Sequence, residues 1–453
     1  MTISKNIRIS GESEALHGEL VERLEFINPR WLENHRMGRW NRNTPKILRF
    51  YSRLPGNGLA IPRGFMRQLL LLSRRHNVAV QLDDRRRTLA EIDLQFKGEL
   101  KNFQQHAADI MLAKDFGTLS APTGSGKTII ALYMIAHRRQ PSLIVVHTKE
   151  LAFQWMDRIG AFLNIAESEI GLIGGGELRV GSKITVALVQ SLYKCASEVS
   201  PKVGFLVVDE CHRAPSRTFT EAVSEFDCQY MLGLSATPWR RDRLSKLIFW
   251  HLGDLHHEVK KSDLVADGHI LDLEVIVRPT DFKPYYDPVN EYSKMLSELT
   301  SNDARNHLIA QDVASESQKG SGRGISLILT DRRHHCYTLQ TLLKNKHHIH
   351  AEVMTGDLSL ETRRSVIERL ESGQIRVLIA TGQLVGEGFD CPGLSTLFLT
   401  TPIRFSGRLV QYLGRILRPA KGIERARVFD YVDVHVGPLR AAALVRQRLY
   451  RTS

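Results

Sequence analysis

One short run of small and polar residues has the composition of a phosphate-binding loop: Ala121-Pro-Thr-Gly-Ser-Gly-Lys-Thr128. Gly124 and Gly126 allow the backbone to turn tightly and to direct its N–H groups at an anion. Lys127 supplies a cation for the β- and γ-phosphates, and the Thr128 hydroxyl is a ligand for Mg²⁺. Although a similar run also occurs as a plain glycine-rich turn, this chemistry predicts a nucleotide site. The predicted nucleotide-binding residues are Thr123, Gly124, Ser125, Gly126, Lys127 and Thr128.

An acidic pair follows a later apolar run and supplies the groups that hydrolysis would need. Asp209 and Glu210 come directly after Phe205-Leu-Val-Val208, a run typical of a buried strand. A carboxylate at a strand end can hold Mg²⁺, and a neighbouring glutamate can orient and polarise the attacking water. An isolated Asp-Glu pair is more often a surface feature, but the strand before it and the phosphate loop upstream favour a site. We therefore predict that Asp209 is a metal ligand together with Thr128, and that Glu210 is the general base.

A second set of candidate residues lies in the C-terminal half of the chain. Ala380-Thr-Gly-Gln-Leu-Val-Gly-Glu-Gly-Phe-Asp390 follows another strand-like run and ends in an acid. Gln411, Arg415 and Arg418 fall at positions i, i+4 and i+7, which predicts that they share one stripe of a helix. Two guanidinium groups on one face suit an arginine finger that reaches a phosphate from a second domain. We predict catalytic roles for Arg415 and Arg418, although the stripe alone is also compatible with a solvated basic helix.

Alternating apolar runs and helical patterns must position these residues. The strand-like runs are 142–146, 184–187 and 205–208 in one half, and 325–329, 376–380 and 396–399 in the other. Near-continuous Val, Ile and Leu runs separated by helices predict parallel sheets covered on both faces, and hence an α/β fold. Ligands of such sheets bind at the carboxyl ends of the strands, which is where the motifs lie. The polar segment 315–324 is predicted to be a loop.

Length, charge and cysteine content limit the possible classes of protein. A chain of 453 residues is too long for one core, and we predict an accessory domain (1–98) and two α/β domains (99–275 and 276–453). A net charge of +13 favours an extended polyanion as partner. Five scattered cysteines without a Cys-x-x-Cys pair argue against zinc and disulfides and favour a reducing compartment. With no secretory or membrane-spanning apolar run, we predict a soluble protein, cytoplasmic or nucleoid-associated, without a membrane partner.

The accessory domain contains a basic segment with interleaved aromatic residues. Between Pro29 and Arg53, seven Arg and Lys residues stand against a single acid, Glu33, with four aromatic residues among them. Cations for phosphates and flat rings for bases are the composition of a nucleic-acid surface. The alternative is that the rings are core and the arginines a solvated face, just as Arg85-Arg86-Arg87 could simply pair with Asp83-Asp84. The predicted nucleic-acid contacts of this segment are Arg36, Arg39, Trp40 and Arg42.

Together, the motifs of residues 99–436 resemble those of superfamily 2 helicases, in family order. The matching segments are Ala121–Thr128 (motif I), Thr148–Leu151 (Ia), Asp209–His212 (II), Ser235–Thr237 (III), Thr381–Asp390 (V) and Gln411–Arg418 (VI). The resemblance implies two tandem RecA-like domains after a smaller N-terminal α+β domain, with ATP between the two and nucleic acid across their top. It also implies that Gln104 reads adenine, that Asp390 lies near the ribose or the seam between the two domains, and that Gln411 contributes to the nucleotide site. The nucleic-acid contacts that it implies are Thr148, Lys149, Gln190, Arg332 and Thr381.

The branch of the superfamily is suggested by two further segments. Phe96–Gln104 and Ser235–Asp242 resemble the XPB/UvsW-type DNA helicases and the motor subunits of restriction enzymes. An Arg-Glu-Asp element of the XPB type would fall at 240–242, but its central residue here is Arg241. The resemblance implies an ATP-dependent DNA helicase or translocase that uses ATP and Mg²⁺. Two alternatives remain: an RNA-directed motor, and a motor subunit with a separate nuclease partner. The N-terminal domain is also a possible docking site for a protein partner.

Overall fold

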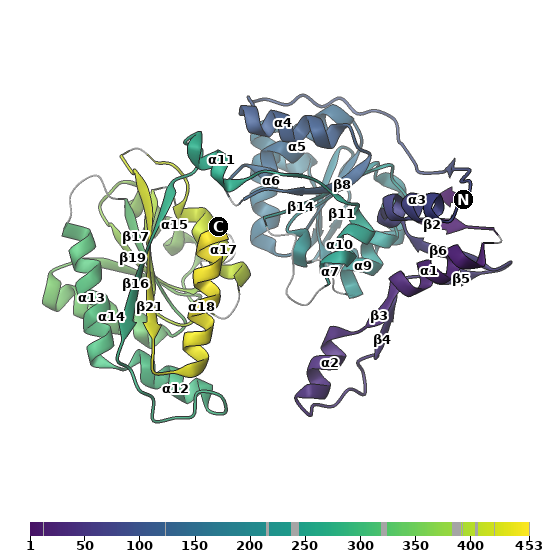
Figure 1. Cartoon of the computed structure of the whole chain (residues 1–453). Helices are drawn as coiled ribbons and strands as arrows, with labels where there is room; N and C mark the ends of the chain where they lie inside the picture. The colour runs from purple at the N-terminus through teal and green to yellow at the C-terminus, as the bar shows by residue number, and fades with distance from the viewer. Residues whose placement is uncertain are drawn as a thin grey trace. The chain divides into compact units, whose positions relative to one another are not determined.

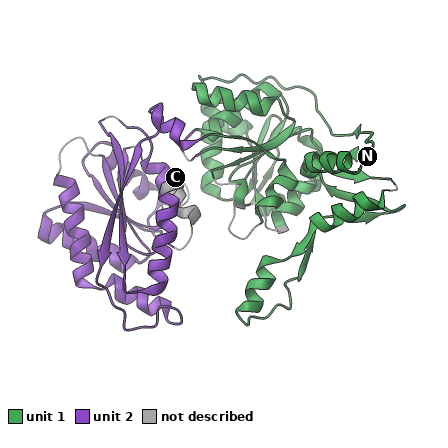
Figure 2. Ribbon diagram, viewed as in Figure 1, with its two compact units in different colours: residues 1–121, 126–259 green, residues 122–125, 260–453 purple. Residues whose placement is uncertain are grey.

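The chain forms two compact units (Figure 2). The computed structural model describes residues 1–11, 13–122, 124–213, 217–236, 244–318, 324–382, 391, 393–403, 406–420 and 422–452. The first unit comprises residues 1–121 and 126–259, and the second comprises residues 122–125 and 260–453. Each unit contains a sheet with helices packed against it (Figure 1), so the predicted α/β fold is confirmed. No helix in the described part of the chain is long and apolar enough to span a membrane.

An eight-stranded sheet forms the centre of the first unit, in the order β11-β10-β12-β9-β13-β14-β8-β15. Its strands are β8 (Phe116–Ser120), β9 (Ser142–Val146), β10 (Gly171–Gly174), β11 (Glu177–Arg179), β12 (Ile184–Leu188), β13 (Phe205–Val208), β14 (Tyr230–Ser235) and β15 (Leu255–Glu258). All neighbours are parallel except β10 and β11. Every residue of β9, β12 and β13 is buried, which is why these strands read as continuous apolar runs in the sequence.

One helix that packs on this sheet precedes its first strand, and the others lie between its strands in sequence. These helices are α4 (Asn102–Leu112), α5 (Lys127–Arg138), α6 (Lys149–Leu163), α7 (Val189–Leu192), α8 (Ala196–Val199), α9 (Arg217–Ser224) and α10 (Ser245–Leu252). Helix α5 begins at Lys127, within the predicted phosphate loop, and two residues separate the end of β9 from the start of α6. Both helix N-termini therefore lie at the carboxyl edge of the sheet.

The second unit is built on a six-stranded parallel sheet in the order β16-β21-β20-β17-β19-β18. The strands are β16 (Asp272–Thr280), β17 (Ile325–Thr330), β18 (Ala351–Met354), β19 (Val377–Thr381), β20 (Leu394–Leu399) and β21 (Arg425–Asp433). The helices are α11 (Lys261–Ala266), α12 (Tyr292–Thr300), α13 (Asp303–Gln318), α14 (Arg333–His347), α15 (Leu360–Glu371), α17 (Ser406–Ile416) and α18 (Gly437–Thr452).

One predicted loop of the second unit is partly wrong. Segment 315–324 was expected to be irregular because it is rich in Ser and Gly, but α13 continues to Gln318. Glu316 is buried in that last turn and accepts a hydrogen bond from Arg427 of β21 at 2.7 Å. This ion pair fixes the helix end against the sheet, an effect that local composition does not reveal. Residues 319–323 lie outside the described part.

The N-terminal domain has a five-stranded sheet in the order β5-β6-β2-β1-β7, with two helices. These elements are β1 (Thr2–Ile3), β2 (Asn6–Ile9), α1 (Glu14–Leu24), β5 (Ser52–Leu54), β6 (Gly58–Pro62), α3 (Met66–Arg75) and β7 (Asp83–Asp84). Residues 25–49 form a separate projection, which we call the arm (Figure 1). The arm consists of the antiparallel pair β3 (Glu25–Ile27) and β4 (Ile47–Arg49), with α2 (Pro29–Arg36) at its far end.

The N-terminal domain shares a hydrophobic core with α10 of the neighbouring sheet. Trp250 of α10 is only 3% exposed and packs edge-on against Phe26, Phe50 and Phe65. Arg63 is buried, and its guanidinium donates a hydrogen bond to the carbonyl oxygen of Cys228 at 2.7 Å. These contacts explain why the N-terminal domain belongs to the same compact unit as the first sheet. The division at residues 98 and 275 remains a prediction.

Candidate nucleotide site and nucleic-acid surface

The predicted motifs of the first unit lie along one edge of its sheet. The phosphate loop follows β8, Thr148 follows β9, Asp209 follows β13, and Ser235 ends β14. Because these strands are parallel, their carboxyl ends lie on the same side of the sheet. The backbone connects them further, since the N–H of Ala121 donates to the carbonyl of Ser235 at 3.0 Å.

The phosphate loop has the backbone geometry that its glycines predict. Gly124 and Gly126 have φ angles of 90° and 82°, in the left-handed region that side chains disfavour. A Cβ atom at Gly126 would also overlap the amide of Gln104, which is buried on α4. Lys127, the first residue of α5, donates from Nζ to the carbonyl of Ala121 at 2.9 Å. The structure thus brings Gln104 and the loop together, and Thr123 lies outside the described residues.

Asp209 is held by hydrogen bonds on both of its carboxylate oxygens. Oδ2 accepts from the indole Nε1–H of Trp155 at 2.9 Å, and Oδ1 accepts from the backbone N–H of Glu210 at 2.9 Å. Burial, followed by the charge of Glu210, raises the pKa of Asp209 to about 6, while Trp155 and Lys127 oppose this shift. Sequence reasoning missed Trp155, because nothing in its local pattern distinguishes it from an ordinary core residue.

Glu210 adopts an unusual backbone conformation beside this aspartate. Its φ angle is 49°, a left-handed value that is uncommon for a residue with a side chain. Its carboxylate lies 3.1 Å from Nδ1 of His212, and the same nitrogen lies 3.1 Å from the hydroxyl of Ser235. His212 therefore connects the acidic pair with the end of β14. The structure brings these side chains together as parts of one site.

The residues present fit a Mg²⁺ ion bound with a nucleotide. Mg²⁺ takes oxygen ligands, and in nucleotide sites it uses one or two protein oxygens together with phosphates and water. Asp209 supplies a carboxylate and Thr128, the second residue of α5, supplies a hydroxyl. Lys127 is close enough for its charge to lower the pKa of Asp209. A cation for phosphate and an anion for metal are thus neighbours.

Residues predicted to contact nucleic acid also lie at strand ends in the first unit. Thr148 caps α6, where its hydroxyl accepts from the N–H of Leu151 at 3.3 Å. Lys149 begins α6 and is exposed, and Gln190 is exposed on α7, directly after β12. All three are on the sheet edge that carries the phosphate loop.

In the second unit, two predicted contacts follow neighbouring strands. Arg332 follows β17 and precedes α14, and its guanidinium donates to Ser293. Thr381 ends β19, which pairs with β17. Asp390 lies outside the described residues, as do 237–243, which include the Arg240–Asp242 element.

The predicted helical stripe of arginines is only partly correct. Arg415 is on α17, but this helix ends at Ile416, so Arg418 follows the helix and does not continue its stripe. Pro419 explains the difference, because a proline disfavours helical geometry at the residue before it. The side chain of Gln411 lies outside the described part.

Two protein families match the sequence. Residues 97–240 match "Type III restriction enzyme, res subunit", and residues 293–420 match "Helicase conserved C-terminal domain". The first match falls mostly in the first unit and the second match falls in the second unit. The chain belongs to helicase superfamily 2.

Relatives of this helicase have names that refer to both DNA and RNA. A putative ATP-dependent RNA helicase of Acanthamoeba polyphaga mimivirus is 28% identical over 76% of the chain, which spans 66% of that relative's length. The DNA 3'-5' translocase XPB2 of Sulfurisphaera tokodaii is 28% identical over 71% of the chain and 79% of its own length. A fragment of a putative HsdR subunit of a type I restriction enzyme from Vibrio vulnificus has a similar fold. It is 17% identical with a TM-score of 0.56, over 74% of this chain and 65% of its own.

The arm of the helicase exposes the basic residues predicted to bind nucleic acid. Arg36, Arg39 and Arg42 are exposed, and Trp40 between them is 87% exposed. Helix α2 has no buried residue at all. The arm therefore presents cations around a ring that is open to solvent.

Other residues of the same basic segment have structural roles. Phe50 stacks on Phe26 at a centroid distance of 5.7 Å, and the Tyr51 hydroxyl donates to Glu25. For Phe50 and Tyr51, the alternative that the aromatic rings of the segment belong to the core is correct. Outside this segment, Arg85 and Arg86 pair with Asp83 and Asp84, and Arg87 pairs with Asp227. Their charges are thus used within the protein.

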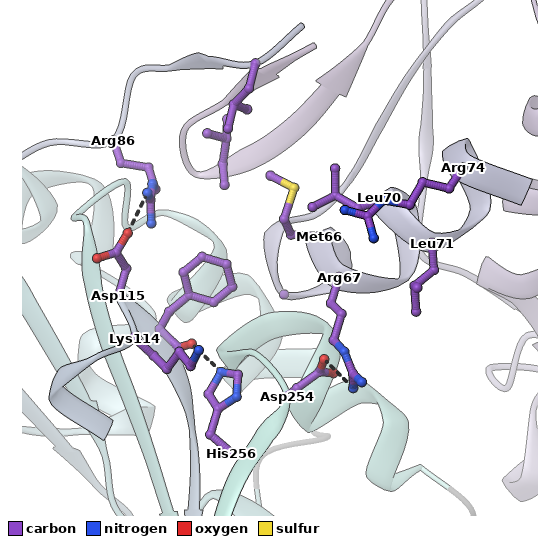
Figure 3. Close-up of a pocket in the computed structure, with 14 residues that line it drawn as sticks. Met66, Arg67, Leu70, Leu71, Arg74, Arg86, Lys114, Asp115, Asp254 and His256 are labelled. Atoms are coloured by element: carbon purple, nitrogen blue, oxygen red, sulfur yellow. Dashed lines mark hydrogen bonds and ion pairs between the residues drawn. The ribbon is translucent and has the colours of Figure 1, made fainter. Parts of the chain in front are cut away.

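A cavity of about 440 Å³ lies elsewhere in the helicase, between α3 and the edge of the first sheet (Figure 3). Leu70 and Leu71 of α3 and Phe116 of β8 line it. Arg67 and Asp254, which form an ion pair at 3.5 Å, also line it. None of the predicted site residues lines this cavity.

Proposed function

We propose that this helicase is an ATP-dependent DNA helicase or translocase. The observation that carries the proposal is the arrangement at the carboxyl edge of the first sheet. A glycine loop with Lys127 at a helix N-terminus lies beside a buried carboxylate, Asp209, and a second acid, Glu210. A helix N-terminus and a lysine bind phosphate, and the two acids suit a metal and a water.

Each residue has a distinct role in the proposed hydrolysis of ATP. Lys127 binds the β- and γ-phosphates, and Thr128 and Asp209 hold Mg²⁺, which supplies neutralising charge on the phosphates when bound. Glu210 orients the water and accepts its proton. His212, whose Nδ1 lies 3.1 Å from the Glu210 carboxylate, helps to position it.

In this proposal the second unit supplies Arg415 and Arg418 to the γ-phosphate. Loss of that phosphate on hydrolysis then removes the contact that favours closure of the two units on ATP. Repeated ATP binding and hydrolysis would in this way move the nucleic-acid strand. Asp390 and Gln411 complete the nucleotide site. Nucleic acid contacts Thr148, Lys149 and Gln190 in the first unit, and Arg332 and Thr381 in the second.

DNA is the proposed substrate because of the named relatives and the exposed arm. The DNA translocase XPB2 is 28% identical to this chain, and the segments Phe96–Gln104 and Ser235–Asp242 resemble those of DNA helicases. An RNA-directed motor is the second candidate, and the name of the viral relative supports it. A motor subunit with a separate nuclease partner is a third, which the restriction-enzyme family match supports.

The test is an ATPase assay with single-stranded DNA, duplex DNA, forked DNA and RNA side by side. We expect DNA to stimulate hydrolysis more than RNA does. Lys127→Ala should abolish hydrolysis but leave DNA binding nearly unchanged, because the phosphate cation is lost while the nucleic-acid surface is intact. Stimulation by RNA alone would favour the second candidate. Normal turnover by Lys127→Ala would contradict the nucleotide site.

A further inference from the structure

We propose that Trp155 is a positioning residue for the metal carboxylate, and that through it helix α6 controls the metal site. The proposal rests on the proposed function, since it takes Asp209 as the Mg²⁺ ligand. Trp155 donates the only polar hydrogen of its side chain to Oδ2 of Asp209 at 2.9 Å. An indole N–H can donate but never accept, so the Asp209 oxygen is always the acceptor in this hydrogen bond.

Burial makes this hydrogen bond strong and fixed in direction. Trp155 is 2% exposed and Asp209 is 8% exposed, so water competes weakly for either partner. A hydrogen bond to a charged acceptor is roughly twice as strong as one between neutral groups. With the Glu210 N–H on the other oxygen, the carboxylate is held at both ends and cannot rotate freely. Metal ligands that are oriented in this way lose about 10–100-fold in metal affinity when the outer partner is removed.

Helix α6 connects this bond with the proposed nucleic-acid contacts. The helix begins at Lys149, just after its cap Thr148, and Trp155 lies two turns further along. At a rise of about 1.5 Å per residue, the cap and Trp155 are roughly 10 Å apart along one rigid element. Strand β9, which leads into α6, also contacts the same aspartate: the backbone N–H of Asp209 donates a hydrogen bond to the carbonyl of Val145 at 3.0 Å. A ligand that shifts the start of α6 therefore acts on the backbone and the side chain of Asp209.

A purely structural role for Trp155 makes a different prediction from a positioning role. If Trp155 only fills the core, removal of its N–H should lower stability and leave metal affinity unchanged. Trp250 provides the matched control. It is also a buried tryptophan of the first unit, but it packs against aromatic rings, and no carboxylate bond to it occurs among the described residues.

The experiment measures binding of Mn²⁺, as a stand-in for Mg²⁺, to the full chain with ADP by electron paramagnetic resonance. Titrations are made with and without single-stranded DNA, for wild type, Trp155→Phe and Trp250→Phe. We expect Trp155→Phe to bind Mn²⁺ about 10–100-fold more weakly, and its affinity should no longer respond to DNA. Trp250→Phe should match the wild type in its Mn²⁺ affinity and in the response of that affinity to DNA. Melting temperatures of the three proteins report how much stability each substitution removes, separately from its effect on Mn²⁺ affinity.

Each other outcome contradicts a stated part of the proposal. Unchanged Mn²⁺ affinity in Trp155→Phe would overturn the positioning role, and a preserved response to DNA would overturn the link through α6. If Trp155→Phe does not fold, benzothienylalanine at position 155 keeps the ring shape without the N–H, and the same titration decides. If the wild type itself binds no Mn²⁺ with ADP, the proposed nucleotide site fails, and this inference fails with it.

Discussion

Replacement of Arg36, Arg39 and Arg42 with glutamine should flatten the salt dependence of DNA binding. The three side chains are exposed on the arm, and the structure gives them no ion pair with any described residue. Each is therefore available for a phosphate. A cation that neutralises a phosphate releases counterions from DNA, so its loss lowers the slope of log K against log salt.

The size of the effect follows from the number of side chains. Each lost contact changes the slope by about 0.9 for duplex DNA and about 0.7 for a single strand. Three contacts therefore change it by about 2.7 or about 2.1. Between about 50 and about 200 mM salt, the wild type should lose roughly 40-fold or roughly 20-fold more affinity than the triple variant does.

The assay is fluorescence anisotropy with labelled DNA at several salt concentrations. The matched control replaces three exposed arginines that are already paired within the N-terminal domain: Arg23 with Glu19, Arg49 with Glu25, and Arg85 with Asp83. This control removes the same net charge and should change the slope much less.

A change at the exposed ring of the arm separates stacking from charge. Trp40→Ala should weaken binding by about 1–3 kcal/mol with an unchanged slope, because stacking releases no counterions. Parallel salt plots for the wild type and the triple variant would refute the reasoning. The arginines would then be a solvated face, and the arm would have another role.

Three further predictions, the first with a control variant, test other parts of the structure. A Cβ at Gly64 would lie 2.6 Å from the carbonyl oxygen of Trp250, so Gly64→Ala should destabilise the first unit by about 1–3 kcal/mol in thermal unfolding. Gly18→Ala, in open space on α1, should be neutral or stabilising by up to about 1 kcal/mol. Arg418→Lys should lower DNA-stimulated ATPase by about 10³-fold with ATP still bound, because an ammonium cannot replace the planar fork; near-normal turnover would contradict a finger. Burial lowers the pKa of His335 to about 3 in the folded protein, from 6.5 in the unfolded chain. Below about pH 6.5 the unfolded chain therefore binds a proton at this residue that the folded protein does not bind, and the folded state loses stability as the pH falls. In urea unfolding, His335→Gln should therefore lose less stability than the wild type between about pH 7 and about pH 5, by up to about 1.4 kcal/mol per pH unit; equal losses would contradict this.

The sequence was sufficient to predict the most buried strands of both sheets and the motifs that follow them, while the roles of the site residues remain predictions. Strands β9 and β13 are buried on both faces, so their sequences carry few polar residues and stand out as apolar runs. The phosphate loop was also visible, because Gly124 and Gly126 are needed at positive φ angles. These features depend on residues that are close together in the chain, so local sequence patterns are enough to predict them.

Other features depend on contacts between distant segments and could not be predicted. Trp155 and Asp209 are 54 positions apart, and only the folded sheet brings them together. Composition also could not separate Trp40, which is exposed, from Phe50, which packs against Trp250. The end of α17 is a different case, because the proline after Arg418 was a signal in the sequence that the prediction did not use.

The shared core around Trp250 affects how the protein can be divided experimentally. A fragment that begins near residue 99 would leave Trp250 and Leu247 of α10 without the N-terminal side chains that cover them. Such newly exposed apolar patches promote association, so the fragment would be prone to aggregate whatever its enzymatic competence. Low activity of a truncated protein would then reflect insolubility and would not measure what the N-terminal domain contributes to DNA binding. A shorter deletion that removes the end of the arm beyond the β3–β4 pair leaves Phe26, Phe50 and Phe65 against Trp250 and gives the cleaner dissection.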